Sequence, residues 1–107
     1  MLQPRPVRLF FVCAMFVSVL TAHAAPYPLG SMSCKDIGVF ASQAMQWRES
    51  GVSLTDAKTR LDGLQPEDSV EKKNLRMVLA LVYGSYGDSW TVESAGTVMQ
   101  VDCESGR

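Results

Sequence analysis

Apolar residues recur at helical spacing along most of the chain beyond residue 32, and capping residues and glycines divide them into segments. The first segment begins with Ser-Cys-Lys-Asp at 33–36, which matches a capping box with Ser33 as the N-cap residue. Gly51 is placed to end this helix as the residue after its C-cap. The apolar face of the helix is formed by Cys34, Ile37, Ala41, Ala44 and Met45, with Phe40 and Trp47 widening it.

The same pattern predicts two further helices. A second capping box at 53–56 precedes a short segment that ends near Gly63, and a third at 68–71 precedes a long apolar segment. The short helix has one apolar face, formed by Leu54, Ala57, Leu61 and Leu64. The long helix carries an apolar stripe of Leu75, Val78, Leu79, Val82 and Tyr86, flanked by Met77, Ala80, Leu81 and Tyr83. Because such a helix is apolar nearly all round, residues 75–83 indicate either a buried central helix or the seam of a homodimer.

The heptapeptide GSYGDSW at 84–90 predicts a turn, after which Asp88 or Ser89 can cap the last helix. The predicted inner face of that helix is formed by Val92, Ala95, Val98, Met99 and Cys103. We therefore predict an all-α fold, a small bundle of about four helices that forms a single domain at 33–107. Two prolines and a glycine within 25–32 predict an extended arm before this domain.

Residues 1–24 have the pattern of a secretory signal peptide. Arg5 and Arg8 precede an apolar run of about twelve residues, and Ala22-His23-Ala24 forms a cleavage site of the A-x-A type. A retained membrane anchor is the alternative, but a spanning helix needs about twenty apolar residues. We therefore expect a periplasmic or secreted bacterial protein, exported by a cleavable signal peptide that is cut between Ala24 and Ala25.

Cleavage changes the composition of the chain. Removal of 24 residues from 107 leaves 83, which is enough for one small domain. The leader contains the only histidine, His23, and two of the ten basic residues, so eight basic residues remain against eleven acids, a net charge of about −3. This charge argues against binding to nucleic acid or to an anionic membrane surface. We expect no nucleic-acid partner and no membrane span after removal of the leader.

Two of the three cysteines, Cys34 and Cys103, remain after cleavage. In an oxidising compartment, a disulfide between them is the default. Cys34 begins the first predicted helix and Cys103 lies near the end of the last one, so the bridge joins these helices if they pack antiparallel. In the chain-entropy model, closing a loop of about 70 residues stabilises the domain by roughly 4 kcal/mol.

The cleaved chain lacks the residues for several common kinds of chemistry. Without histidine, a Ser-His-Asp triad, a Cys-His dyad and a His-ligated zinc site are excluded, and two cysteines cannot form a four-cysteine site. Phosphate-binding glycine loops and EF-hand loops are also absent from the sequence. Acids for a paired-carboxylate glycosidase are present, but most lie at caps or at helical spacing with lysines, as Asp62 does with Lys58. We expect no enzyme activity, no cofactor and no metal.

Two segments contain candidate residues for partner binding. Tyr83, Tyr86 and Trp90 surround flexible glycines and can form a platform for a peptide, a glycan or a protein. Alternatively, these rings close the core at a turn between two helices. Trp47 and Arg48 have the composition of an interface hot spot, although Trp47 can instead pack inward with Arg48 covering it.

The segment SCKDIGVFASQAMQWRESGVSLTDA, together with Cys103, resembles a widespread class of small, mostly uncharacterised exported bacterial proteins. Their shared outline is a leader, a cysteine at the start of the first helix, an R-x-x-G-x-S turn (here 48–53) and a cysteine in the last helix. The resemblance implies an exported, single-disulfide helical fold and no particular activity. In architecture alone, the chain is also similar to acid-stress chaperones of the HdeA type and to immunity proteins that neutralise exported cell-wall hydrolases.

These observations favour a non-catalytic periplasmic or secreted helical domain that binds a protein or a cell-envelope component. One alternative is an acid-stress periplasmic chaperone, because eleven acids without histidine would make the cleaved chain strongly positive around pH 3–4. A second alternative is an immunity or inhibitor protein against an exported hydrolase.

Overall fold

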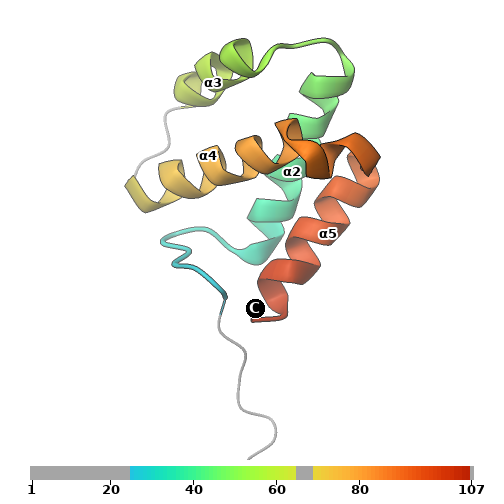
Figure 1. The fold of residues 1–107 in the computed structure, drawn as a ribbon. Helices are drawn as coiled ribbons and strands as arrows, with labels where there is room; N and C mark the ends of the chain where they lie inside the picture. Colours follow the sequence, from blue (N-terminus) through green and yellow to red (C-terminus); the bar gives the residue numbers. More distant parts are fainter. Residues whose placement is uncertain (1–24, 65–68, 107) are drawn as a thin grey trace, which may run out of the picture.

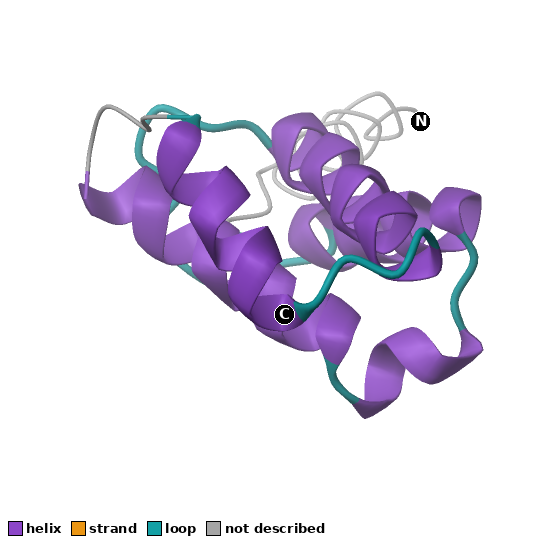
Figure 2. Cartoon of the chain, turned by 90° about the horizontal axis from the view of Figure 1, so that it is seen from above, coloured by secondary structure: helices purple, strands orange, loops and turns teal. Residues whose placement is uncertain are grey.

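The computed structural model describes residues 25–64 and 69–106 (Figure 1). Within these residues the chain forms four α-helices and one short 3₁₀ helix: α2 (Cys34–Glu49), α3 (Leu54–Gly63), α4 (Ser69–Tyr83), η1 (Ser85–Ser89) and α5 (Val92–Glu104). Figure 2 shows the same helices from above, with no strand in the part of the chain that is described. The predicted all-α fold of about four helices is confirmed. The predicted signal peptide lies outside the described residues, as does Asp68 of the third capping box.

Local sequence sets most of the helix ends. The hydroxyl of Ser33 accepts a hydrogen bond from the backbone N–H of Asp36, and the Asp36 carboxylate accepts one from the backbone N–H of Ser33. The Ser53 hydroxyl accepts from the backbone N–H of Asp56 at the start of α3. Gly51 follows the C-cap of α2 with a φ of 86°, in the left-handed region that favours glycine. The first two predicted helix starts and the predicted end of α2 are therefore confirmed.

The predicted cap of the last helix is wrong. Thr91, rather than Asp88 or Ser89, is the N-cap of α5, and it forms a capping box with Ser94. Asp88 and Ser89 belong instead to η1, and the carboxylate of Asp88 pairs with Arg48 of α2. Asp88 is therefore not available as a cap, because it pairs with Arg48, which lies 40 residues earlier in the chain.

α2 packs most extensively against α5, and the two helices run antiparallel side by side (Figure 1). Their backbones approach closely: a Cβ atom at Gly38 would lie 2.8 Å from the backbone oxygen of Gly96. At the same crossing, the Ser42 hydroxyl donates a 2.8 Å hydrogen bond to the backbone oxygen of Val92. Cys34 and Cys103 form a disulfide at the far end of this pair, as predicted.

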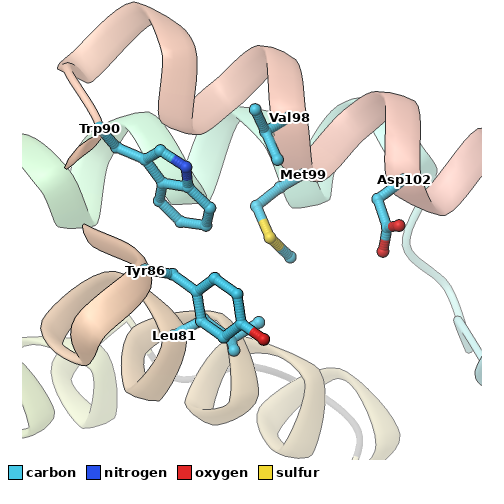
Figure 3. Close-up of a pocket in the computed structure, with 6 residues that line it drawn as sticks. All are labelled: Leu81, Tyr86, Trp90, Val98, Met99 and Asp102. Carbon is cyan, nitrogen blue, oxygen red and sulfur yellow. The ribbon is translucent and has the colours of Figure 1, made fainter. Parts of the chain in front are cut away.

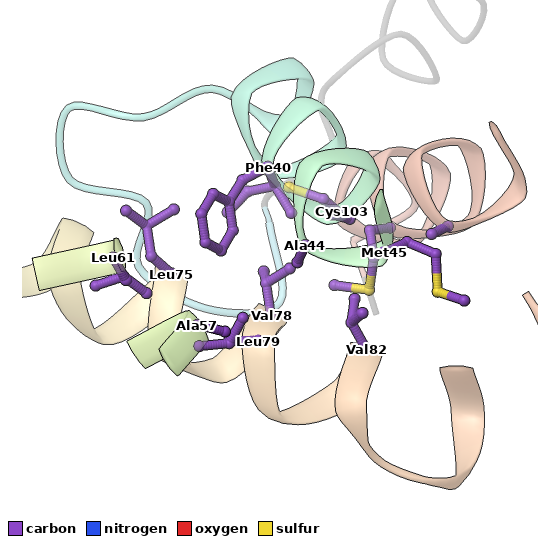
Figure 4. Close-up of a cluster of buried hydrophobic side chains, with 14 residues drawn as sticks. Phe40, Ala44, Met45, Ala57, Leu61, Leu75, Val78, Leu79, Val82 and Cys103 are labelled. Carbon is purple, nitrogen blue, oxygen red and sulfur yellow. The ribbon is translucent and has the colours of Figure 1, made fainter. Parts of the chain in front are cut away.

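α4 crosses α2 and carries much of the core, and α3 also packs against α4, with Ala57 and Leu61 buried in the same cluster (Figure 4). The largest fully buried side chains are Ile37, Leu61, Leu79, Val78, Val82 and Cys103. Four apolar positions predicted to face the core are exposed instead: Leu54, Leu64, Tyr86 and Val98. Tyr86 is exposed because the chain leaves α4 at Tyr83 and continues as η1, which removes it from the helical stripe.

The predicted arm at 25–32 lies against α4. The amide of Asn74, a buried polar side chain in α4, donates a 2.9 Å hydrogen bond to the backbone oxygen of Pro28. Tyr27, Leu29 and Met32 pack against the core from the arm. The arm therefore covers the first half of α4 and leaves the second half, next to η1, to other neighbours.

Candidate functional site

A groove lies between the end of α4, η1 and α5 (Figure 3). Its cavity measures about 310 Å³. Six residues line it: Leu81, Tyr86, Trp90, Val98, Met99 and Asp102. We call this feature the aromatic groove. Two of the five residues predicted for partner binding, Tyr86 and Trp90, lie in it.

The aromatic pair forms one wall of the groove. The rings of Tyr86 and Trp90 are stacked, with centroids 6.1 Å apart and planes inclined by 27°. Trp90 is half-buried and packs against the core, whereas the side chain of Tyr86 is 62% exposed. Trp90 therefore anchors the pair to the core, while Tyr86 presents its ring to solvent.

α5 supplies the opposite wall. Val98 and Asp102 are four residues apart and lie on the same side of the helix, and Figure 3 shows Met99 pointing toward the ring of Tyr86. A second hollow, lined by Thr97, Val98, Val101 and Asp102, continues from this wall. Since Val98 and Val101 are both exposed, the apolar surface extends from the groove along α5.

Arg48 holds the turn that carries the aromatic pair. Its Nη1 donates to the backbone oxygens of Val82 and Gly84, at 2.8 and 3.2 Å, and its Nη2 pairs with Asp88. The last carbonyls of a helix have no partner within the helix, so a guanidinium at this end satisfies them and complements the helix dipole. Gly87 completes the contact, because a side chain there would overlap the Val82 oxygen and the guanidinium. Arg48 therefore lies behind the groove and supports η1.

The two remaining predicted residues lie elsewhere. Trp47 packs edge-on against Phe40, with ring centroids 5.9 Å apart, and the guanidinium carbon of Arg60 lies 5.7 Å from the centre of its ring. The hydroxyl of Tyr83 donates a 2.8 Å hydrogen bond to the backbone oxygen of Val52, before α3. The structure thus divides the five predicted residues between the groove and the contacts that join α2, α3 and α4.

The groove carries negative charge at one end. Asp102 is the single charged residue among the six that line it, and it lies at the end opposite Trp90 (Figure 3). α5 contains three acids, Glu93, Asp102 and Glu104, and neither lysine nor arginine. Burial raises the pKa of the nearby Tyr27 hydroxyl, and the Asp102 carboxylate raises it further. Four residues of the groove were not predicted as site residues, because no local signal links them to the turn at 84–90: Leu81, Val98, Met99 and Asp102.

The lining of the groove is largely apolar, with few polar groups. Its polar groups are one carboxylate, one phenol and one indole N–H, which provide neither a nucleophile with an adjacent base nor a pair of carboxylates. In the described part of the chain, His, Cys, Asp and Glu side chains do not gather in groups of three or more that could hold a metal ion.

No family model, curated protein or solved structure matches the chain. Among the helices at 25–64 and 69–106, none combines the length and apolarity that crossing a membrane requires.

Proposed function

We propose that the chain is a non-catalytic, exported helical domain that binds a protein partner through the aromatic groove. The observation that carries this proposal is the exposure of Tyr86, whose ring is 62% accessible while it stacks on a core-anchored Trp90 over an apolar hollow. Tyrosine and tryptophan are enriched among the residues that contribute most to protein interfaces.

The construction of the groove supports a binding role. Trp90 is fixed by the core, and η1 is fixed by Arg48, so the aromatic wall is largely preformed. A preformed apolar site loses less conformational entropy on binding than one that must be ordered. An apolar lining with few polar groups is typical of sites that bury a ligand side chain.

Two further features support export. The leader has the sequence pattern of a cleavable signal peptide. Cys34 and Cys103 are joined by a disulfide, a bond that persists in oxidising compartments and is rare in the cytosol.

Photocrosslinking in cells tests the proposal with a matched control. The full chain, expressed with its own leader, carries benzoylphenylalanine at position 86 or at position 39. Tyr86 and Val39 are both 62% exposed, but Val39 lies on α2, outside the residues that line the groove. We expect discrete protein adducts from position 86 and none of the same mass from position 39. Equal adducts from both positions, or none from position 86, would contradict the proposal.

A further inference from the structure

The charge around the aromatic groove indicates the chemistry of its occupant. We infer that the groove binds a protein segment in which a bulky apolar side chain lies next to a lysine or arginine, with the apolar group between the aromatic pair and Met99 and the cation on Asp102. This inference rests on the proposed function and adds the character of the partner to it.

Asp102 is placed to contact both parts of such a segment. It lines the aromatic groove and also the second hollow on α5, so its carboxylate stands within a continuous apolar surface that includes Val98 and Val101. An apolar chain lying in the groove would therefore pass directly beside a negative charge.

Asp102 has no cation of its own among the described residues. The ion pairs formed there join Arg48 to Asp88 and join Lys72 and Arg76 to Asp62. On α5, Glu104 accepts a 3.0 Å hydrogen bond from Gln100, which is a neutral partner. A bound partner would exclude water from the apolar surface around this carboxylate and so lower the local dielectric constant. The attraction between the carboxylate and a cation of the partner would then be stronger than in water.

The same charge argues against other occupants. In a dimer that pairs this surface with itself, neither copy would offer a cation to the other's Asp102, because Asp102 is the single charged residue among those that line the two hollows. Anionic lipid headgroups would meet the same carboxylate, which would repel them. A cationic, apolar protein segment is the occupant that satisfies both the rings and the charge.

Selection from a phage-displayed library of random dodecapeptides tests the inference. The bait is the processed protein purified from cells that express the full chain. We expect selected peptides to be enriched both in Leu, Phe or Trp and in adjacent Lys or Arg. With Asp102→Asn as bait, the basic enrichment should disappear while the apolar enrichment remains, and with Tyr86→Ala the apolar enrichment should disappear.

Affinities of one selected peptide then give the size of the effect. We expect Asp102→Asn to weaken binding about tenfold at low salt, which corresponds to about 1.4 kcal/mol, and Glu104→Gln on the same helix to leave it unchanged. Circular dichroism would verify that both variants fold.

The possible failures separate the two proposals. Apolar peptides without basic enrichment, bound equally by Asp102→Asn, would overturn the inference and leave the proposed function standing. An absence of any selection that depends on Tyr86 would overturn both. Tyr86-dependent dimerisation in light scattering, or Tyr86-dependent binding to phosphatidylglycerol vesicles, would replace the proposed occupant and so also overturn the inference.

Discussion

Arg48, in the last turn of α2, donates a 2.8 Å hydrogen bond from Nη1 to the backbone oxygen of Val82, in the last turn of α4. The same side chain also reaches Gly84 and Asp88, so one guanidinium joins the end of α2 to the end of α4 and to η1. This contact gives the arginine of the R-x-x-G-x-S turn a structural role. It also determines where the aromatic wall of the groove begins.

Substitution of Arg48 by alanine should therefore destabilise the fold. The side chain is 28% exposed, and its loss removes its hydrogen bonds to the Val82 and Gly84 carbonyls and its ion pair with Asp88. We expect the free energy of unfolding, measured by urea denaturation, to fall by about 2–3 kcal/mol. Arg48→Lys should give an intermediate loss, because an ammonium cannot match the planar fork of donors.

Arg76→Ala is the matched control for this change. Arg76 also forms an ion pair, to Asp62 at 3.4 Å, but both side chains are more than half exposed. Exposed pairs of this kind contribute about 0–1 kcal/mol. Equal losses for Arg48→Ala and Arg76→Ala would argue against the structural role of Arg48.

Gly87→Ala should disrupt the turn at η1. A Cβ atom at this position would overlap the backbone oxygen of Val82 and Nη1 of Arg48, so the backbone must shift. We expect a loss of at least about 2 kcal/mol in the free energy of unfolding. Gly63→Ala provides the comparison, because a Cβ atom there meets no atom within 4 Å at the end of α3. That variant should be stabilised by up to about 1 kcal/mol, and a harmless Gly87→Ala would show that the turn is not confined as described.

Removal of the disulfide should lower stability more than either change at the turn. Cys34 and Cys103 are separated by 69 residues, for which the chain-entropy model gives roughly 4 kcal/mol. We expect a reductant to lower the urea midpoint of the wild-type protein to that of the Cys34→Ala/Cys103→Ala variant, and to leave the variant unaffected. An unchanged wild-type midpoint, with both thiols free by mass spectrometry, would contradict the bridge.

Stability should decline at alkaline pH through two tyrosines. Burial raises the pKa of Tyr27 and of Tyr83 above the usual value of about 10. The Asp102 carboxylate raises the pKa of Tyr27 further. The guanidinium groups of Arg60 and Arg48 partly offset the rise in the pKa of Tyr83. The folded protein then keeps protons that the unfolded chain releases, so this stability is present below pH 10 and is lost as pH rises through the folded pKa.

A double variant, Tyr27→Phe/Tyr83→Phe, tests this dependence. Its free energy of unfolding should fall less steeply than that of the wild type between about pH 9 and pH 11. Tyr86→Phe, which removes a hydroxyl from an exposed ring, should retain the wild-type slope. If the free energy of unfolding falls equally steeply in the wild type and both variants, groups other than Tyr27 and Tyr83 cause the loss of stability at alkaline pH.

The helices themselves were predictable because their signals are local. Ser33 and Ser53 lie three residues before the backbone N–H groups that they cap, and Gly51 adopts its left-handed conformation at the position where the periodic pattern stops. The cap of α5 was mispredicted because Asp88 is engaged by Arg48, which is distant in sequence. Asp62 shows the same limit: helical spacing suggests Lys58, whereas the carboxylate contacts Lys72 and Arg76 on α4.

The candidate site was predictable only in part. Tyr86 and Trp90 were identified because both belong to one short aromatic turn, and they do meet in the groove. Tyr83 belongs to the same stretch of sequence, but its hydroxyl bonds Val52, away from the groove-lining residues. Asp102 gave no sign of a role, because it reaches the groove only when α5 folds back along α2.

By itself, the sequence determined the helical class and the ends of most helices, because capping, glycine conformation and hydrophobic period act over a few residues. It also predicted the pairing of Cys34 with Cys103, because these are the two cysteines that follow the predicted leader. The tertiary structure alone decided that Arg48 supports the turn, that Tyr86 faces solvent and that Asp102 lies at the end of the aromatic groove. These outcomes depend on how closely α2, α4 and α5 approach one another, which packing across the whole chain sets.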